Sequence, residues 1–536
     1  MAPNTIAVLF VDVATNRKLT YSQLRSSAER FGAGLQEQWR WLKGDVLATM
    51  TPNHIDVAPA TFGAQLVGGV VCPLNSMYTV DELVSQLTSS KAKGLLTNVA
   101  CLEVACKAAS KVGLPLDHIL LVRDGKPTKG VRHFSSLGSA SKSVKRVNID
   151  PKEDLAYLVY SSGTTGVPKG VMLTHENIVA NIVQKTIADG HSPDWKTDKS
   201  IGFLPMYHIY GRSSIFHSQT FADAYRHRRP DTGTVFYGTT AYFMQGFDLQ
   251  KFCEMVDREG ITIAWIVPPV ALALAKAPMA DQYNLKSLRD LHSSAAPAPV
   301  EIITTVHKRI GAPLRQAYGL SEAAPAVCTQ RIEDWNKPMG TSGRLLPNMS
   351  AKLMSDGKEV EEGGEGEGEV CLKGPNIFKG YYNNPEATSG AFDAEGWYHT
   401  GDVGKFDKHG NLYVTDRLKE LIKYNGFQVA PAELEALLLG HPAVADVAVI
   451  GVYDGSRVTE LPRAYIVVAT GYKGGEKLEE ELHKWFDGRV APHKKLRGGI
   501  RFVEAVPKSN AGKILRRVLV EQAKLEEAEK TIKARL

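Results

Sequence analysis

The segment from Tyr160 to Gly170 combines residue types that suit phosphate binding. It reads Tyr-Ser-Ser-Gly-Thr-Thr-Gly-Val-Pro-Lys-Gly. Glycines let the backbone bend so that amide groups point inward, while hydroxyl side chains donate hydrogen bonds and a lysine adds positive charge. The residues expected to contact phosphate are Ser161, Ser162, Gly163, Thr164, Thr165 and Lys169. A ligand-free polar turn would explain Gly-Thr-Thr-Gly alone, but it explains the full segment poorly.

The flanking sequence suggests how this loop is held. Residues 155–159 form an apolar run of strand length, and residues 174–177 are typical of a helix start. We therefore expect the loop to join a strand to a helix. It is not a Walker loop, because Pro168 stands where that pattern requires a glycine before the lysine. A different type of nucleotide site is indicated.

Three later segments also carry groups able to bind a nucleotide or an apolar ligand. His208 and Tyr210 lie in an aromatic run at residues 204–211. Residues 316–322 supply the ring of Tyr318, which could stack on a base, and the carboxylate of Glu322, which could bind a metal ion. Asp402 could accept both hydroxyls of a ribose. Taken singly, each segment is better explained by core packing or by a turn.

The length and composition of the whole chain indicate a large globular enzyme. Its 536 residues are too many to fold around a single hydrophobic core, and they suggest three or four structural units. Hydrophobic residues make up 43% and charged residues 23%, which excludes disordered and fibrous classes. The net charge is +6, which is small for a chain of this length. The sequence contains no basic stripe interleaved with aromatic residues, so we expect no nucleic-acid partner.

The cysteines and the termini bear on cellular location. Six cysteines without Cys-x-x-Cys pairs or nearby histidines predict neither a disulfide framework nor a zinc site. Residues 261–279 are apolar but contain Pro268-Pro269 and Lys276, which favours a strand and a core helix over a membrane span. The N-terminus lacks the features of a secretory signal. Ala534-Arg535-Leu536 matches the C-terminal peroxisomal signal, so we expect recognition by the peroxisomal import receptor, and a cytoplasmic location otherwise.

The order of elements predicts an α/β protein with several domains. Strand-like segments at 45–50, 70–72, 94–97 and 119–122 alternate with helical stretches. From about residue 343, glycine- and glutamate-rich turns separate short strands at 370–373 and 412–415, which indicates an antiparallel β unit. After residues 416–419, a helix at 432–439 and strands at 444–450 and 463–468 predict a small C-terminal domain.

With these segments in view, the chain resembles the adenylate-forming superfamily of acyl-CoA synthetases, luciferases and peptide-synthetase adenylation domains. It is most similar to the branch of 4-coumarate:CoA ligases. Five motifs occur in the order of that family, at residues 160–170, 316–322, 398–402, 416–428 and 507–513. The resemblance implies a large N-terminal domain of stacked α/β lobes plus a β unit at 1–415, a hinge at 416–420, and a small mobile α+β domain at 421–536.

The resemblance also implies roles for individual residues and names the substrates. ATP, Mg²⁺ and coenzyme A are expected, with a small carboxylic acid. ATP contacts are expected from the phosphate loop and from Gln316, Tyr318, Ser321, Asp402 and Arg417; Glu322 would hold the metal. The acyl pocket would be lined by Tyr210, Ser214, Ala295, Gly319, Pro325 and Ala326. Catalytic residues would be Lys513, Lys423, Gln428 and His208, with Lys419 as the hinge and Asn425 and Gly426 beside coenzyme A.

These residues predict an AMP-forming ligase acting on an aryl, cinnamyl-type or medium-chain acid through an acyl-AMP intermediate. Alternatives are an enzyme that passes acyl-AMP to an amine or a carrier protein, a luciferase-like oxygenase, and an inactive binding homologue. Ser294, Ala317 and Asn425 depart from the residues usual in the family. Residues 212–236 also look like an insertion, which we interpret as a surface loop, with a basic flap near the substrate mouth as the alternative.

Overall fold

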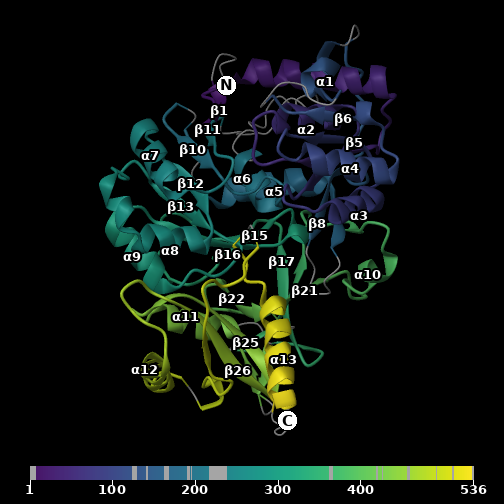
Figure 1. Ribbon diagram of the computed structural model, residues 1–536. Coiled ribbons are helices and arrows are strands. Elements are labelled where there is room, and N and C mark those ends of the chain that lie inside the picture. Colours follow the sequence, from purple (N-terminus) through teal and green to yellow (C-terminus); the bar gives the residue numbers. More distant parts are fainter. Residues whose placement is uncertain are drawn as a thin grey trace.

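The computed structural model describes residues 8–123, 130–139, 143–161, 168–189, 193–194, 196–216, 238–360, 366–417, 420–424, 427–454, 459–490, 492–509 and 512–533. Two wide β-sheets with their helices form most of the molecule (Figure 1). In that view, the C-terminal elements gather at one end, below β16 and β22. No described helix is long and apolar enough to cross a membrane. Each of the six cysteines lies outside any disulfide.

The first sheet has eight strands and carries both ends of the phosphate loop. In spatial order they are β20 (Gly380–Tyr381), β9 (Lys169–Thr174), β8 (Leu155–Ser161), β4 (Val70–Leu74), β3 (Val46–Met50), β5 (Ala92–Thr97), β6 (Ile119–Leu121) and β7 (Arg132–His133). The accompanying helices are α1 (Tyr21–Trp39), α2 (Val57–Leu66), α3 (Val80–Ser90) and α4 (Leu102–Val112). The α/β alternation predicted for this region is confirmed.

The phosphate loop joins two antiparallel strands, so the expected direct passage from strand to helix is wrong. β8 pairs with β9 from Leu155↔Thr174 to Ser161↔Lys169. Residues 169–174 form a strand because Val171 and Leu173 are fully buried in the core. The helix follows immediately, since Thr174 caps α5 (His175–Ala188) through a capping box with Asn177. The predicted helix start is therefore correct, with a strand inserted before it.

The second sheet has nine strands and supplies most of the other predicted site segments. In spatial order they are β16 (Arg344–Leu345), β15 (Ala326–Thr329), β14 (Leu314–Gly319), β13 (Asp290–Ser293), β12 (Ile263–Ile266), β10 (Lys199–Gly202), β11 (Thr240–Phe243), β1 (Val8–Asp12) and β2 (Lys18–Thr20). Its helices are α6 (Ile209–Phe216), α7 (Leu249–Glu259), α8 (Pro268–Lys276) and α9 (Val300–Ile310). The strand and core helix expected within 261–279 are thus β12 and α8.

Helix α5 lies between the two sheets. It contacts β8 and β9 of the first sheet and β15 of the second. Its Asn181 side chain donates to the carbonyl of Ala326 at 2.7 Å and accepts from the amide of the same residue at 3.1 Å. One hydrophobic core contains residues from both sheets, among them Val159 and Val327. The two sheets are therefore joined firmly enough to hold a site built from both.

The antiparallel unit predicted after residue 343 is confirmed. Its strands are β18 (Lys358–Glu359), β17 (Ser350–Ser355), β19 (Gly368–Lys373), β21 (Tyr398–Phe406) and β22 (Leu412–Arg417), and every neighbouring pair is antiparallel. The short helix α10 (Pro385–Ser389) precedes β21. Within this unit, β21 and β22 place Asp402 opposite Arg417.

The C-terminal elements form a group with its own hydrophobic core. They are β23 (Ile422–Tyr424), β24 (Phe427–Val429), α11 (Pro431–Leu439), β25 (Val444–Asp454), β26 (Thr459–Val468), α12 (Glu476–Asp487), β27 (Ile500–Phe502) and α13 (Arg516–Lys533). The helix and strands expected there are confirmed. This group touches the larger part through the Lys276 ammonium, which donates to the Val444 carbonyl at 3.2 Å. The domain boundaries at 415 and 421 stay a prediction.

Candidate active site

The two described ends of the phosphate loop lie beside the predicted metal ligand. The Ser161 hydroxyl donates to Oε1 of Glu322 at 3.3 Å. The Lys169 ammonium lies 5.0 Å from the ring centroid of Tyr381, within the range of a cation–π contact. Ser162, Gly163, Thr164 and Thr165 are outside the described residues. Of the six predicted phosphate contacts, Ser161 therefore touches Glu322 directly, and Lys169 lies over Tyr381, a neighbour of Glu322.

Glu322 is a buried carboxylate held by hydroxyl groups. It belongs to the short 3₁₀ helix Ser321–Ala323, which follows β14. Its Oε1 accepts from the Tyr381 hydroxyl at 3.1 Å as well as from Ser161. Burial raises the pKa of this carboxyl above its usual value. Among the described residues, no basic side chain lies within ion-pair distance of it, although the positive charge of Arg417 acts on it from farther away.

Asp402 is held by a phenol and a guanidinium. The Tyr318 hydroxyl donates to Oδ2 at 2.6 Å, and Nε of Arg417 lies 3.0 Å from Oδ1. Burial, reinforced by the Asp402 carboxylate, raises the pKa of Tyr318 well above 10, so the phenol keeps its proton and remains a donor. Three predicted nucleotide contacts, from β14, β21 and β22, therefore lie together.

Lys513 reaches this cluster from the C-terminal group. Burial and the positive charge of Arg417 lower the pKa of its ammonium to about 8, while Glu420 and Asp402 act in the opposite direction. The preceding Gly512 packs on the larger part: a Cβ there would lie 3.0 Å from Cγ of Pro269, at the start of α8. The structure thus places the predicted catalytic lysine close enough to Asp402 and Arg417 for their charges to act on its ammonium.

The second predicted catalytic lysine is in a different environment. Lys423 lies in β23, and its side chain is exposed to solvent. Its backbone amide donates to Oε2 of Glu460 at 2.7 Å, which anchors the hairpin to β26. Lys419, Asn425 and Gly426 lie outside the described residues, as does the side chain of Gln428. In this arrangement it is Lys513 that contributes to the buried cluster.

Gln316 is engaged by protein groups on both sides of its amide. Its Oε1 accepts from the amide of Ala298 at 2.6 Å, and its Nε2 lies 3.4 Å from the carbonyl of Thr341. Its own backbone amide donates to Oε1 of Gln330 at 2.7 Å. Gln316 therefore ties the loops around β14 together, and its contact with the nucleotide remains a prediction, as does that of Ser321.

His208 and Tyr210 are held at the start of α6. Asn53 fixes the preceding loop: its Oδ1 accepts from the amide of Met206 at 2.8 Å, and its Nδ2 donates to the carbonyl of Leu204 at 3.0 Å. Burial lowers the pKa of His208 to about 4, so its imidazole is neutral at pH 7. The Tyr210 hydroxyl donates to the carbonyl of His292 at 2.8 Å. Tyr210 therefore presents its ring, not its hydroxyl, as a surface for a ligand.

The remaining predicted pocket residues gather at the carboxyl ends of β13 and β14. The Ser294 hydroxyl donates to the carbonyl of Ala317 at 2.9 Å, which links the two loops. Ala295 adopts a φ of 75°, a left-handed conformation uncommon for a residue other than glycine. Gly319 packs closely on the next turn, since a Cβ would lie 2.3 Å from the carbonyl oxygen of Pro325. The side chain of Ser214 is not among those described.

The segment interpreted as a surface excursion begins inside the protein. Arg212 is 2% exposed, and its guanidinium donates to the carbonyl of Met206 at 3.0 Å and to the hydroxyl of Thr61 at 3.2 Å. Residues 212–216 are the end of α6. The expectation of a surface position is therefore wrong at this end, because Arg212 finds buried acceptors. Residues 217–236 lie outside the described residues.

Sequence reasoning missed three residues that shape the site. Tyr381 donates to Glu322 and carries the ammonium of Lys169 over its ring. Gln330 holds the backbone of β14, and Asn53 holds the loop that leads to His208. None of them stands in a recognisable motif. Each acts through a contact distant in sequence, so only the fold identifies it.

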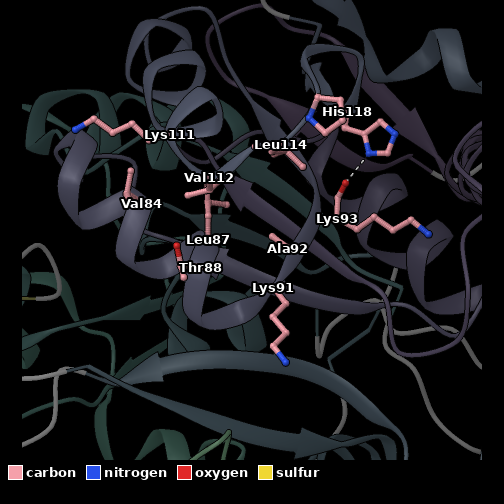
Figure 2. A pocket seen from close by; sticks show the side chains of 12 residues that line it. Val84, Leu87, Thr88, Lys91, Ala92, Lys93, Lys111, Val112, Leu114 and His118 are labelled. Carbon is pink, nitrogen blue, oxygen red and sulfur yellow. Dashed lines mark hydrogen bonds between the residues drawn. The ribbon is translucent and has the colours of Figure 1, made fainter.

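A hollow elsewhere on the first sheet is separate from this cluster. It has a volume of about 620 Å³ and lies between α3, α4 and β5 (Figure 2). Two of its lysines already have partners, since Lys93 pairs with Asp45 at 2.6 Å and Lys111 pairs with Asp81 at 2.8 Å. None of the residues lining it was predicted to bind substrate. The candidate active site is therefore the cluster around Glu322, Asp402 and Lys513.

Comparisons with known proteins agree with this geometry. The AMP-binding enzyme family matches residues 1–382, and the AMP-binding enzyme C-terminal domain matches residues 433–513. The chain is 36% identical to 4-coumarate-CoA ligase 1 of Narcissus pseudonarcissus, over 95% of this chain and 89% of the relative. It is 37% identical to a probable 4-coumarate–CoA ligase 1 of Dictyostelium discoideum, over 96% and 92%.

Solved structures of similar fold cover almost the whole chain. ATP-bound MatB from Rhodopseudomonas palustris has a TM-score of 0.83 at 26% identity, over 98% of this chain and 97% of that one. The o-succinylbenzoate CoA synthetase MenE of Bacillus subtilis, in complex with an acyl-adenylate, has a TM-score of 0.78 at 26% identity, over 97% and 96%. The larger part and the C-terminal group therefore match these structures together.

Proposed function

Because the chain belongs to the adenylate-forming family of AMP-binding enzymes, in its 4-coumarate-CoA ligase-like branch, we propose that it joins a carboxylic acid to coenzyme A at the expense of ATP. The reaction has two steps. The acid first forms acyl-AMP and pyrophosphate, and coenzyme A then takes the acyl group and releases AMP. The observation that carries the proposal is that Lys513 lies close enough to the Asp402–Arg417 ion pair to interact electrostatically with both of its members.

In the first step, a carboxylate oxygen attacks the α-phosphorus of ATP, and the bond from that phosphorus to the oxygen bridging to the β-phosphate breaks. Negative charge develops on the α-phosphate oxygens as this happens. The ammonium of Lys513 stabilises that charge where it forms. The carboxylate of Asp402, oriented by Tyr318 and Arg417, accepts the ribose hydroxyls and so fixes the nucleotide relative to Lys513.

A magnesium ion fits the donor set at Glu322. Mg²⁺ prefers oxygen ligands, and this buried carboxylate, with hydroxyl donors and without a basic partner among the described residues, suits such an ion. When bound there, Mg²⁺ would neutralise phosphate charge. Ser161 and Tyr381 would orient the carboxylate that holds it, and Lys169 would contribute a further positive charge for the phosphates.

In the second step, the coenzyme A sulfur attacks the acyl carbonyl carbon, the bond between that carbon and the AMP oxygen breaks, and the thiol proton passes to solvent or base. We propose that rotation about Lys419, within a hinge at 416–420 that separates domains 1–415 and 421–536, withdraws Lys513 for this step. The rotation would bring Lys423, Gln428 and the Asn425-Gly426 turn to the site. Neutral His208 would border the path of the thiol.

The acid class is proposed from the pocket and the relatives. Relatives named 4-coumarate-CoA ligases suggest a cinnamyl-type acid, and aryl and medium-chain acids are the other candidates. The ring of Tyr210 offers an apolar wall because its hydroxyl is engaged by a carbonyl. The small side chains of Ala295 and Ala326 leave space for an extended acyl group.

The decisive test is a panel of cinnamyl, aryl and fatty acids, with AMP, pyrophosphate and thioester all measured. We expect one class of acid to give AMP and thioester in equal amounts only when coenzyme A is present. Pyrophosphate released without thioester, and increased by an added amine, would instead support transfer to an amine. The absence of pyrophosphate with every acid would support an inactive homologue.

We also propose a peroxisomal location, supported by Ala534-Arg535-Leu536 at the end of this sequence. These residues lie outside the described part of the chain and outside every site motif. Removing them from a fluorescently tagged chain is expected to move it from peroxisomes to cytosol while activity in lysate stays unchanged. A punctate distribution that persists after the deletion would contradict the proposal.

A further inference from the structure

A thiol, an imidazole and a carboxylate, the three side-chain groups that bind zinc in proteins, converge between two strands of the antiparallel sheet. Strand pairing sets Cys371 of β19 directly opposite His399 of β21, although the two are 28 residues apart in sequence. The Cys371 sulfur lies 3.4 Å from Nδ1 of His399. Oε2 of Glu369 lies 2.8 Å from the same nitrogen. All three ligand atoms lie within 4.8 Å of one another.

The separation of 3.4 Å between the Cys371 sulfur and Nδ1 of His399 matches a tetrahedral zinc site, whereas the 2.8 Å between Glu369 and the same nitrogen is a hydrogen-bond distance that must open to admit the ion. Zinc bonds of about 2.3 Å to sulfur and about 2.0–2.2 Å to nitrogen and oxygen place neighbouring ligand atoms roughly 3.3–3.6 Å apart. Small side-chain adjustments therefore suffice to hold the ion. The three residues leave one coordination position for water. The entry path is open on the histidine side, since the side chain of His399 is 31% exposed and that of Glu369 is 17% exposed.

The surroundings favour a divalent cation at this place. Oδ2 of Asp393 lies 3.7 Å from Nε2 of His399, on the side of the ring away from the cluster. The usual outer partner of a metal-bound histidine is a carboxylate at this ring nitrogen, and Asp393 faces that nitrogen beyond hydrogen-bond distance. Lys352 faces Cys371 across β17 and β19, but its ammonium is directed to Asp393 at 3.2 Å and Glu395 at 3.5 Å. The negative charges of three carboxylates, Glu369, Asp393 and Glu395, therefore exceed the positive charge of the one nearby ammonium.

The arrangement does not suit a nucleophilic cysteine. In a catalytic relay the thiol and the carboxylate contact opposite ring nitrogens, whereas here Cys371 and Glu369 meet the same nitrogen, Nδ1 of His399. Cys371 is also fully buried. A single N–H at Nδ1 cannot form a good hydrogen bond to both Cys371 and Glu369. A cation bound between the three atoms can be ligated by all of them.

We propose that Glu369, Cys371 and His399 bind a thiophilic divalent cation, represented by Zn²⁺, with Asp393 as the outer partner of His399. Binding releases the thiol proton to solvent. The site is distinct from Glu322, and it adjoins the nucleotide segment, because Oε1 of Glu369 accepts the amide of Gly401 at 2.9 Å and Asp402 follows in the chain. From the sequence we predicted no zinc site at any cysteine, because Cys371 and His399 are 28 residues apart along the chain.

The experiment titrates the untagged, metal-stripped protein with Co²⁺ in the absence of ATP and magnesium. We expect one Co²⁺ per chain, with the near-ultraviolet absorption of a cobalt–thiolate bond, and displacement of that ion by Zn²⁺. Cys371→Ser should remove the absorption, while Cys328→Ser, at another buried cysteine without a histidine partner, should retain it. Asp393→Asn keeps all three ligands and should weaken binding about 10- to 100-fold.

Each result decides the proposal. Stoichiometric binding that is lost in Cys371→Ser and weakened in His399→Gln supports it. No thiolate absorption in the wild-type protein, or absorption unchanged in Cys371→Ser, overturns it. If Cys371→Ser fails to fold by circular dichroism, Glu369→Gln and His399→Gln carry the test, and unchanged Zn²⁺ affinity in both overturns the proposal.

Discussion

At the scale of single residues, Lys513 is the group on which acyl-AMP formation should depend most. Its ammonium lies in the electrostatic range of Asp402 and Arg417. Removing one preorganised donor of transition-state charge typically costs about 2.7–4 kcal/mol, or a hundred- to thousandfold in rate. We expect Lys513→Ala to release pyrophosphate about a hundred- to thousandfold more slowly than the wild-type protein. Transfer from supplied acyl-AMP to coenzyme A should be largely retained.

The matched control for this prediction is Lys508→Ala. Lys508 lies in the same motif, but its ammonium pairs with Asp446 at 2.6 Å instead of facing the nucleotide. Its pyrophosphate release should stay within a few-fold of wild type. Near-normal adenylation by Lys513→Ala, measured in the same assay, would refute the role assigned to Lys513.

The pKa of Lys513 leads to a prediction about how acyl-AMP formation depends on alkaline pH. Burial lowers the pKa of Lys513 to about 8, so the required ammonium is present below that pH and is lost above it. The value of kcat/KM for ATP in acyl-AMP formation should therefore fall above pH about 8. Lys513→Arg keeps its charge throughout this range, so its activity, though lower, should lack this limb. An identical limb in Lys513→Arg would assign the titration to another group.

Motifs and the family resemblance predicted several residues that the structure brings together, but not the contacts made between strands. Asp402, Arg417 and Tyr318 were predicted from motifs and lie together in the structure. Tyr381 was missed, because its position beside Glu322 results from the pairing of β20 with β9. The pairing of Cys371 with His399 was missed for the same reason. Register between distant strands is set by tertiary packing, which spacing along one chain does not reveal.

At the scale of elements, strands and helices with strong local signals were predicted well. The capping residue Thr174 marked the start of α5 correctly. β9 was missed because it follows Pro168, contains Gly170 and has no turn signal before the helix. Only their pairing with β8 and the burial of Val171 and Leu173 make them a strand. The two described ends of the phosphate loop, Ser161 and Lys169, are consequently paired directly, with Cα atoms about 4.5–5.5 Å apart as in any antiparallel pair.

The hairpin of β23 and β24 carries the second half-reaction in our proposal. Lys423 is exposed here and has no part in the buried cluster. Lys423→Ala should therefore leave pyrophosphate release near normal. It should slow thioester formation from supplied acyl-AMP about a hundredfold, the usual effect of losing a positioning group. Lys473→Ala, at another exposed position of the C-terminal group, is the control. Equal loss of both half-reactions in Lys423→Ala would argue against domain rotation.

At the scale of the whole molecule, the α/β rhythm and the motif order predicted the main parts of the chain. The rhythm is local, since each strand and its helix are neighbours in sequence. How the C-terminal group sits on the larger part has no such local signal. It depends on a few contacts distant in sequence, such as those of Lys276 with Val444 and of Gly512 with Pro269.

The contact at Gly512 leads to a prediction about how the two parts dock. Gly512 has a φ of +78°, and a Cβ there would lie 3.0 Å from Pro269. Pro269 belongs to a helix N-terminus and cannot easily move aside, so Gly512→Ala should disfavour the arrangement that places Lys513 at the nucleotide. We expect pyrophosphate release to fall at least about tenfold, corresponding to about 1.4 kcal/mol. Thioester formation from supplied acyl-AMP should be unaffected, because that step uses the rotated arrangement.

Gly471→Ala separates docking from backbone strain. Gly471 also has a positive φ, +93°, but a Cβ there would meet nothing within 4 Å. Both substitutions therefore carry the backbone cost of about 1–2 kcal/mol for a left-handed residue, and only Gly512→Ala adds the clash with Pro269. Loss of pyrophosphate release in Gly512→Ala alone, with similar thermal stability for the two variants, would show that this docked arrangement is the one that makes acyl-AMP. Equal effects of the two substitutions would show that Lys513 acts without this docking contact.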